Sequence, residues 1–156
     1  MNKTIGYSSL VVFFGAGMAL AACQPQWVSD QNSFLAGFVN HELLSVLGVI
    51  LALTLGSIAN IHLEFNRLEE RYNAVFLNKS RANLRKNAYW LISLFVAAIV
   101  IVVVKPIASQ GAASQGVFNV LAMLVVLWHI LILISLSDLV FAMIADVRGD
   151  EPPKPQ

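Results

Sequence analysis

Four long apolar runs constrain the fold of this chain more than any other feature. They cover residues 5–23, 43–61, 89–104 and 117–136. A helix needs about 20 apolar residues to cross a hydrocarbon core of about 30 Å. The third run reaches that length, on to Ala108, if Lys105 extends its ammonium group to the lipid surface. The sequence therefore predicts an all-α, polytopic membrane protein with four transmembrane helices.

The distribution of charge predicts how these helices are oriented. Charged residues make up 12% of the chain, against about 25% in soluble domains. Six of the ten Lys and Arg lie at 62–88, and Lys3, Arg148 and Lys154 flank the outermost runs, whereas Lys105 lies on the opposite side. The positive-inside rule then predicts a bacterial inner-membrane protein with both termini and residues 62–88 in the cytoplasm. The net charge of +1 gives no reason to expect a nucleic-acid partner.

The single cysteine, Cys23, excludes an internal disulfide bond. Residues 20–23 read Leu-Ala-Ala-Cys, which matches the cleavage box of a bacterial lipoprotein. One interpretation is therefore a cleaved signal with a lipidated Cys23 and three remaining spans. The favoured interpretation is an uncleaved first transmembrane helix that ends in this sequence.

Small residues recur at four-residue intervals in the first two apolar runs. Gly15 and Ala19 form one such line, and Gly48, Ala52 and Gly56 form a longer one. Small residues at this spacing let helix backbones approach closely in lipid. They predict helix contacts within the subunit or between subunits, and we expect a homo-oligomer that packs through the first two helices.

The second helix is expected to continue out of the membrane as a cytosolic stalk. Ile61, Phe65, Leu68 and Tyr72 follow one another at steps of four, three and four, which is a short heptad seam. This seam, with Arg67 and Arg71 beside it, could contact its own chain, another subunit or a cytosolic partner.

The expected domains follow from these helices. The fourth helix exceeds the bilayer core and is also expected to extend into the cytoplasm. The sequence thus predicts a transmembrane domain over 1–146, which includes a cytosolic hairpin at 62–88. A disordered tail is expected over 147–156.

A basic cluster precedes the third run and consists of Lys79, Arg81, Arg85 and Lys86. Such clusters are attracted to anionic lipid headgroups, so membrane lipid is an expected partner. A simple topology signal also accounts for the cluster. Tyr89 and Trp90 follow it, as in an interfacial aromatic belt.

Few ionisable groups lie within the predicted spans, where they are costly and often functional. His129 is expected to hydrogen-bond Thr54 or Ser57, with a proton-linked role as the alternative. Asp138 is expected to pair with Arg67 or Arg71. At the outer rim, Asn40, His41 and Glu42 could bind an ion, sense an external signal or cap the second helix.

Motifs of enzymes and cofactor proteins are not found in this sequence. It contains no phosphate-binding glycine loop, no HExxH and no CxxC, and its three histidines are placed at different membrane depths. We therefore expect a non-enzymatic protein that holds no metal and no cofactor.

The overall layout resembles small membrane proteins of bacterial anti-phage systems. Four spans, both ends inside and a basic cytosolic segment are similar to the membrane subunit of the Kiwa defence system, KwaA, and to the phage exclusion protein RexB. The resemblance is one of architecture and carries over no residue role. It implies a self-associating membrane scaffold or sensor that signals to a cytosolic partner. The alternatives are an ion channel or small transporter, lined by His129, Ser135 and Thr54, and an accessory subunit of a respiratory or secretion complex.

Overall fold

The computed structural model describes residues 3–72 and 78–149, and within these ranges the side chains of 68–72, 78–80, 139 and 141–149 are left out, as is that of Lys3. The described chain is helical, with four long helices and three short ones and no strand. The long helices are α1 (Lys3–Cys23), α4 (Leu43–Tyr72), α5 (Asn78–Ala108) and α6 (Ala112–Gly149). The short ones are α2 (Pro25–Val28), α3 (Ser33–Gly37) and the π-helical turn η1 (Phe38–Glu42).

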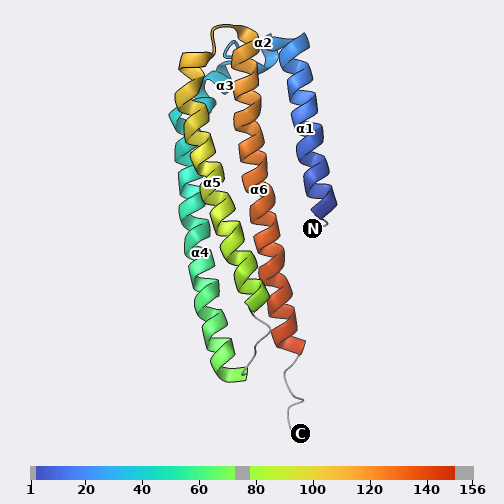
Figure 1. The fold of residues 1–156 in the computed structure, drawn as a ribbon, viewed down its shortest axis with the longest axis vertical. Helices are drawn as coiled ribbons and strands as arrows, with labels where there is room; N and C mark the ends of the chain where they lie inside the picture. The colour runs from blue at the N-terminus through green and yellow to red at the C-terminus, as the bar shows by residue number, and fades with distance from the viewer. Residues whose placement is uncertain (1–2, 73–77, 150–156) are drawn as a thin grey trace.

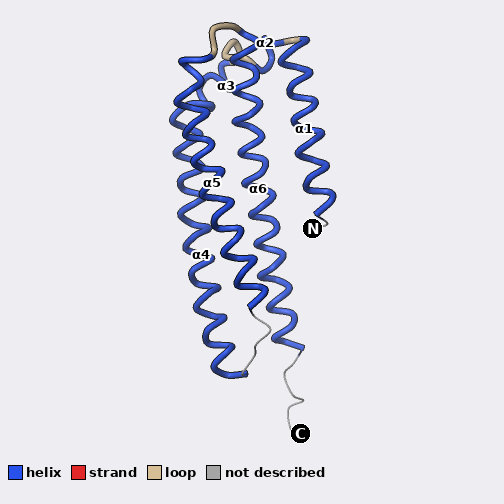
Figure 2. The backbone as a smooth tube through the Cα atoms, viewed as in Figure 1, coloured by secondary structure: helices blue, strands red, loops and turns tan. Residues whose placement is uncertain are grey.

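The long helices form an elongated bundle around α6. Helix α1 packs along one side of α6, whereas α5 packs along another side and against α4 (Figure 1). Helices α2 and α3 lie together at one end of the bundle, which we call the capped end (Figure 2). At the opposite end, called the hairpin end, α4, α5 and α6 extend well past the first residues of α1 (Figure 1).

The four long helices confirm the predicted membrane class. Each contains a stretch that is long and apolar enough to cross a bilayer. These candidate spans are Thr4–Cys23, Ser33–Arg67, Arg81–Ala108 and Ala112–Asp138.

The connection between α5 and α6 is short. Helix α5 continues to Ala108, with Pro106 in its last turn. The backbone N–H of Ser109 donates to the carbonyl oxygen of Lys105 just past the helix end. Helix α6 begins at Ala112, so residues 109–111 alone separate it from α5. Ser114 stabilises its start by hydrogen bonds to the backbone of Gly111.

Helix α6 runs to Gly149. The predicted end of the transmembrane domain at residue 146 stays a prediction. Residues 150–156, the rest of the predicted tail, lie outside the described part.

A short folded segment connects α1 to α4 at the capped end. Asn32 caps α3, because its side-chain oxygen accepts hydrogen bonds from the backbone of Phe34 and Leu35. The chain then kinks at Val39 and Asn40, whose backbone angles are not helical. The kink separates α3 from α4, although the two together with η1 form one continuous apolar stretch, the candidate span Ser33–Arg67.

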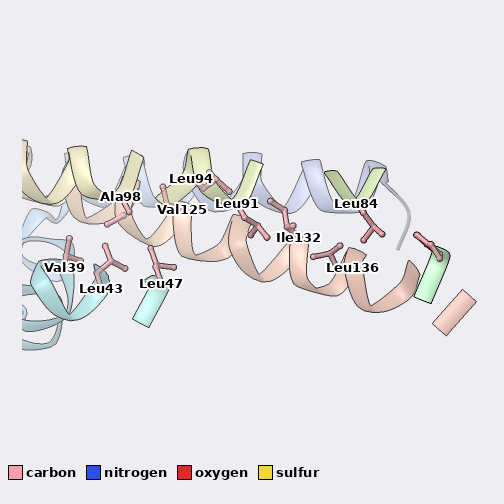
Figure 3. Packing of buried hydrophobic residues seen from close by; sticks show 12 residues of the cluster. Val39, Leu43, Leu47, Leu84, Leu91, Leu94, Ala98, Val125, Ile132 and Leu136 are labelled. Carbon is pink, nitrogen blue, oxygen red and sulfur yellow. The ribbon is translucent and has the colours of Figure 1, made fainter. Parts of the chain in front are cut away.

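The buried core runs along the faces that α4, α5 and α6 share. Figure 3 shows Leu91 and Leu94 of α5 beside Ile132 and Val125 of α6. Near the capped end the same cluster includes the start of α4, and near the hairpin end it includes Phe65 and Leu84, which are almost fully buried. Apolar side chains also cover much of the outer surface, as expected of a protein surrounded by lipid.

Candidate functional site

A buried ion pair joins the capping segment to the bundle. The Lys105 ammonium nitrogen lies 2.6 Å from an Asp30 carboxylate oxygen, and Lys105 is only 6% exposed. The same ammonium group lies 3.5 Å from the Val39 carbonyl oxygen. The expectation that Lys105 reaches the lipid surface is therefore wrong, because Asp30 supplies a countercharge inside the bundle.

Asn119 of α6 extends this network. Its side-chain amide donates to the Val28 carbonyl oxygen at 2.8 Å and to the Asp30 carboxylate at 3.1 Å. Burial disfavours the charged form of Asp30, but hydrogen bonds from Lys105 and Asn119 and the charge of Lys105 outweigh this effect. The pKa of Asp30 therefore lies below its ordinary value. The network links the segment between α2 and α3 to α5 and α6, and Asp30 and Asn119 were not identified from the sequence.

The three polar residues of the predicted outer rim lie at the kink before α4. Asn40, His41 and Glu42 are all exposed. The Ser45 hydroxyl donates to the carbonyl oxygen of His41 at 3.0 Å, so a side chain of α4 contacts the backbone of this turn. Among the described residues, no group of three metal-ligating side chains comes together here or elsewhere.

His129 is fully buried on α6. Its Nδ1 lies 3.0 Å from the carbonyl oxygen of Val125, so this nitrogen carries a hydrogen and donates it there. The expected bond to Thr54 or Ser57 is not formed, because both hydroxyls donate to carbonyl oxygens four residues earlier in α4. His129 Nε2 is buried and has no hydrogen-bond partner in the described part of the chain.

A groove of about 510 Å³ lies between α4 and α6. Its walls are mainly apolar, but they include the polar side chains of Thr54, Ser57, Asn60 and Ser137. Leu133 of α6 also lines it. Because His129 precedes Leu133 by one helical turn, it lies on the same face of α6, toward the capped end. Ser135, the third member of the predicted polar path, is exposed and does not line this groove.

The small residues of α1 fall on two faces. Gly17 packs against α6 so closely that an added Cβ would lie 2.6 Å from a Val120 methyl group. Ala21 is buried beside Gly116 of α6. Gly15 and Ala19, the predicted contact residues, are exposed and point away from this interface. Their predicted role in contacts between subunits stays a prediction.

The small residues of α4 turn progressively outward along the helix. A Cβ on Gly48 would contact the ring of Phe95 at 3.8 Å, in α5. Ala52, Gly56 and Asn60 are exposed, and nothing lies within 4 Å of a Cβ built on Gly56. The described chain thus leaves most of this small-residue face uncovered.

The predicted stalk seam packs within its own chain where it is described. Phe65 is 0% exposed and belongs to the same buried cluster as Leu84 of α5. Arg81 of α5 donates to the side-chain oxygen of Asn66 at 2.8 Å, which also ties α5 to α4. Ile61 is partly buried against this cluster. The side chains of Leu68, Arg71 and Tyr72 lie outside the described part.

The charged residues near the hairpin end are described only in part. Arg67 forms an exposed ion pair with Glu64, one turn earlier in α4, at 2.6 Å. Asp138 is exposed on α6. The predicted pairing of Asp138 with Arg71 involves a side chain outside the described part and stays a prediction.

The basic cluster divides into residues with different surroundings. Arg81 contacts Asn66, whereas Arg85 and Lys86 are exposed and line a shallow hollow on α5. Lys79 belongs to the side chains that are not described. Near the hollow, the rings of Trp90 and Trp128 stack with centroids 5.5 Å apart and connect α5 to α6.

No protein-family model, curated protein or solved structure matches this chain.

Proposed function

We propose that this chain is a non-enzymatic inner-membrane subunit that self-associates through α4 and presents a cytoplasmic helical hairpin to a protein partner. The exposed face of α4 formed by Ala52, Gly56 and Asn60 is the main support. Small residues there permit close approach of a second helix. The described chain offers Asn60 no hydrogen bond, so its amide is available to a second copy of this helix.

A second copy of the chain satisfies both requirements of this face. In a two-fold dimer the same residues lie opposite one another. Two copies of Asn60 can then exchange amide hydrogen bonds, while Ala52 and Gly56 let the two α4 helices approach. Gly48 contributes less, because it already contacts Phe95 of its own chain.

Helix lengths support a hairpin that projects beyond the membrane. Helix α4 has 30 residues and α6 has 38, which correspond to about 45 and 57 Å. Both exceed a hydrocarbon core of about 30 Å. The excess lies at the hairpin end, where basic residues are most frequent, so the positive-inside rule places that end in the cytoplasm.

Self-association is tested by enlarging Gly56. Gly56→Leu fills the open α4 face without a clash inside the subunit, so the protein is expected to lose its dimer on chemical cross-linking in native membranes. Gly15→Leu makes the same change on α1 and reports whether the Gly15 and Ala19 face contributes. An unchanged cross-linked fraction for Gly56→Leu would reject the α4 contact.

Partner recruitment is tested by reversing charge on the hairpin. Arg67→Glu with Arg71→Glu is expected to release a cytosolic partner in a mild-detergent pull-down while the protein stays in the membrane. The architectural resemblance makes a phage-defence effector the partner that we propose to look for. Unchanged co-purification would count against recruitment through these arginines.

The groove between α4 and α6 favours a second candidate, a channel or small transporter. Polar groups line a cavity within two candidate spans, and His129 Nε2 lies buried near it without a partner. This function predicts ion or proton flux in liposomes that His129→Leu abolishes. Flux that is absent, or is unchanged by the substitution, would exclude this path.

A further inference from the structure

A hollow of about 330 Å³ lies on one face of α5, where the basic segment meets the apolar run. Its lining residues recur at helical spacing, so they form a continuous strip along the helix. They are Ala82, Arg85, Lys86, Tyr89, Trp90 and Ser93.

The wall of this hollow is held in place by α6. Trp90 stacks on Trp128 with ring centroids 5.5 Å apart and an angle of 25° between the planes. This stack fixes the Trp90 ring relative to two helices. Tyr89 stands beside it with 64% of its surface exposed, so its hydroxyl group is accessible to a ligand.

The hollow carries two positive charges that the described chain does not neutralise. Arg85 and Lys86 are exposed, and neither forms an ion pair or hydrogen bond with a described residue. Arg81, one turn earlier, instead donates to Asn66. The predicted lipid-binding cluster is thus divided, and Arg85 and Lys86 together line the hollow.

The depth of the hollow follows from two contacts of α6. Gly17 of α1 lies against Val120, and Trp90 of α5 lies against Trp128. Helices α1 and α5 both run antiparallel to α6, so positions along them can be compared by counting residues from these two contacts. This count places the start of the α1 span level with Arg85. If the α1 span marks the membrane level, the two cations are expected at the membrane surface, with Ser93 deeper.

We propose that this hollow binds the headgroup of an anionic phospholipid. Arg85 and Lys86 contact the phosphate, and the Tyr89 and Ser93 hydroxyls donate hydrogen bonds to headgroup or ester oxygens. The acyl chains lie along the exposed apolar surface of α5 that continues through Val96 and Val100. Charge complementarity selects an anionic lipid, because a zwitterionic headgroup places an ammonium group near the two cations.

Native mass spectrometry of the full chain in mild detergent tests this site. The wild-type protein, titrated with phosphatidylglycerol, is expected to retain more lipid than with phosphatidylethanolamine. Each cation contributes about fivefold in affinity at a membrane surface, so Arg85→Gln with Lys86→Gln should weaken phosphatidylglycerol binding by at least tenfold. Equal retention of the two lipids by the wild type would overturn the proposal.

A matched variant separates a site from general charge attraction. Arg67→Gln removes the same charge from an exposed arginine of α4, outside the hollow, and is expected to leave lipid retention unchanged. If Arg67→Gln and Arg85→Gln lowered phosphatidylglycerol retention equally, the proposed site would be overturned. Glycerol phosphate, which lacks acyl chains, should fail to displace the lipid, and displacement would assign the hollow to free phosphate compounds.

A third variant keeps both charges and alters only the deep end of the hollow. Ser93→Leu should fill this space and lower phosphatidylglycerol retention, although Arg85 and Lys86 remain. Helical circular dichroism identifies a variant that has unfolded. An unchanged retention for folded Ser93→Leu would contradict the proposed position of the headgroup.

Discussion

At the scale of residues, close packing and one buried ion pair fix the position of α1 and of the capped end. Gly17 and Gly116 allow α1 and α6 to approach closely. Lys105 and Asp30 bring opposite charges together where α5 ends. Lys105 is 6% exposed and Gly17 is in close contact with Val120, so the geometry of both places is more demanding than that of the exposed stripes on the same helices.

We predict that Gly17→Ala destabilises the protein by about 1–3 kcal/mol. The added Cβ would lie 2.6 Å from a methyl group of Val120, and a β-branched side chain in a helix has little freedom to turn away. Thermal unfolding in detergent measures the change. Gly15→Ala is the control, because nothing lies within 4 Å of a Cβ at that position. Equal melting temperatures for the two variants would contradict the tight α1–α6 contact.

The depressed pKa of Asp30 predicts a loss of stability in acid. A carboxyl group whose pKa is lower in the folded state stabilises the fold above its unfolded pKa of about 3.9. That contribution is lost as the pH falls through the lower, folded value. We expect Asp30→Asn to remove this part of the pH dependence below about pH 4.

The same variant leaves Lys105 without its countercharge at neutral pH, which should cost about 3 kcal/mol. Adding Lys105→Met should restore part of the loss, since no buried charge remains. Thermal unfolding at several pH values measures both effects. An acid transition that is identical in wild type and Asp30→Asn would show that Asp30 does not contribute to it.

At the scale of elements, α4 and α5 form a hairpin whose inner side is closed by apolar side chains. Phe65 and Leu84 are buried there, whereas Arg67 and Glu64 remain exposed. The heptad spacing predicted an apolar seam but left its partner open. The structure assigns Phe65 to contacts within the chain, because α5 returns alongside α4.

We predict that Phe65→Ala destabilises the hairpin by about 3–5 kcal/mol, since it leaves a cavity at a fully buried position. Leu63→Ala, at a position that is 56% exposed, provides the matched control and should change stability little. Hydrogen exchange of residues 58–67 and 81–90 in detergent measures the effect. Faster exchange in Leu63→Ala than in Phe65→Ala would contradict the assigned packing.

At the scale of the whole molecule, the sequence predicted the fold class better than it predicted the contacts between side chains. Run length and composition were sufficient for four apolar helices, because the cost of exposing backbone to lipid leaves few alternatives. The pairing of Lys105 with Asp30 depends on a short segment folding back over the bundle. One signal was present: with four spans, the connection that contains Asp30 falls on the same side of the membrane as Lys105. Periodicity alone could not decide which of two small-residue stripes on α1 faces α6, since both have the same spacing.

The orientation of the whole bundle gives the last prediction. Helix α1, with 21 residues, matches the thickness of a bilayer core and marks its level. The hairpin end then projects from the side with more basic residues, which the positive-inside rule predicts to be the cytoplasmic side. In a Cys23→Ser background, we expect Gln110→Cys to react with a membrane-impermeant maleimide in intact cells. Asn83→Cys should react only after the inner membrane is opened. Both positions are exposed. Labelling of Asn83→Cys alone in intact cells would show that the orientation is the reverse of the predicted one.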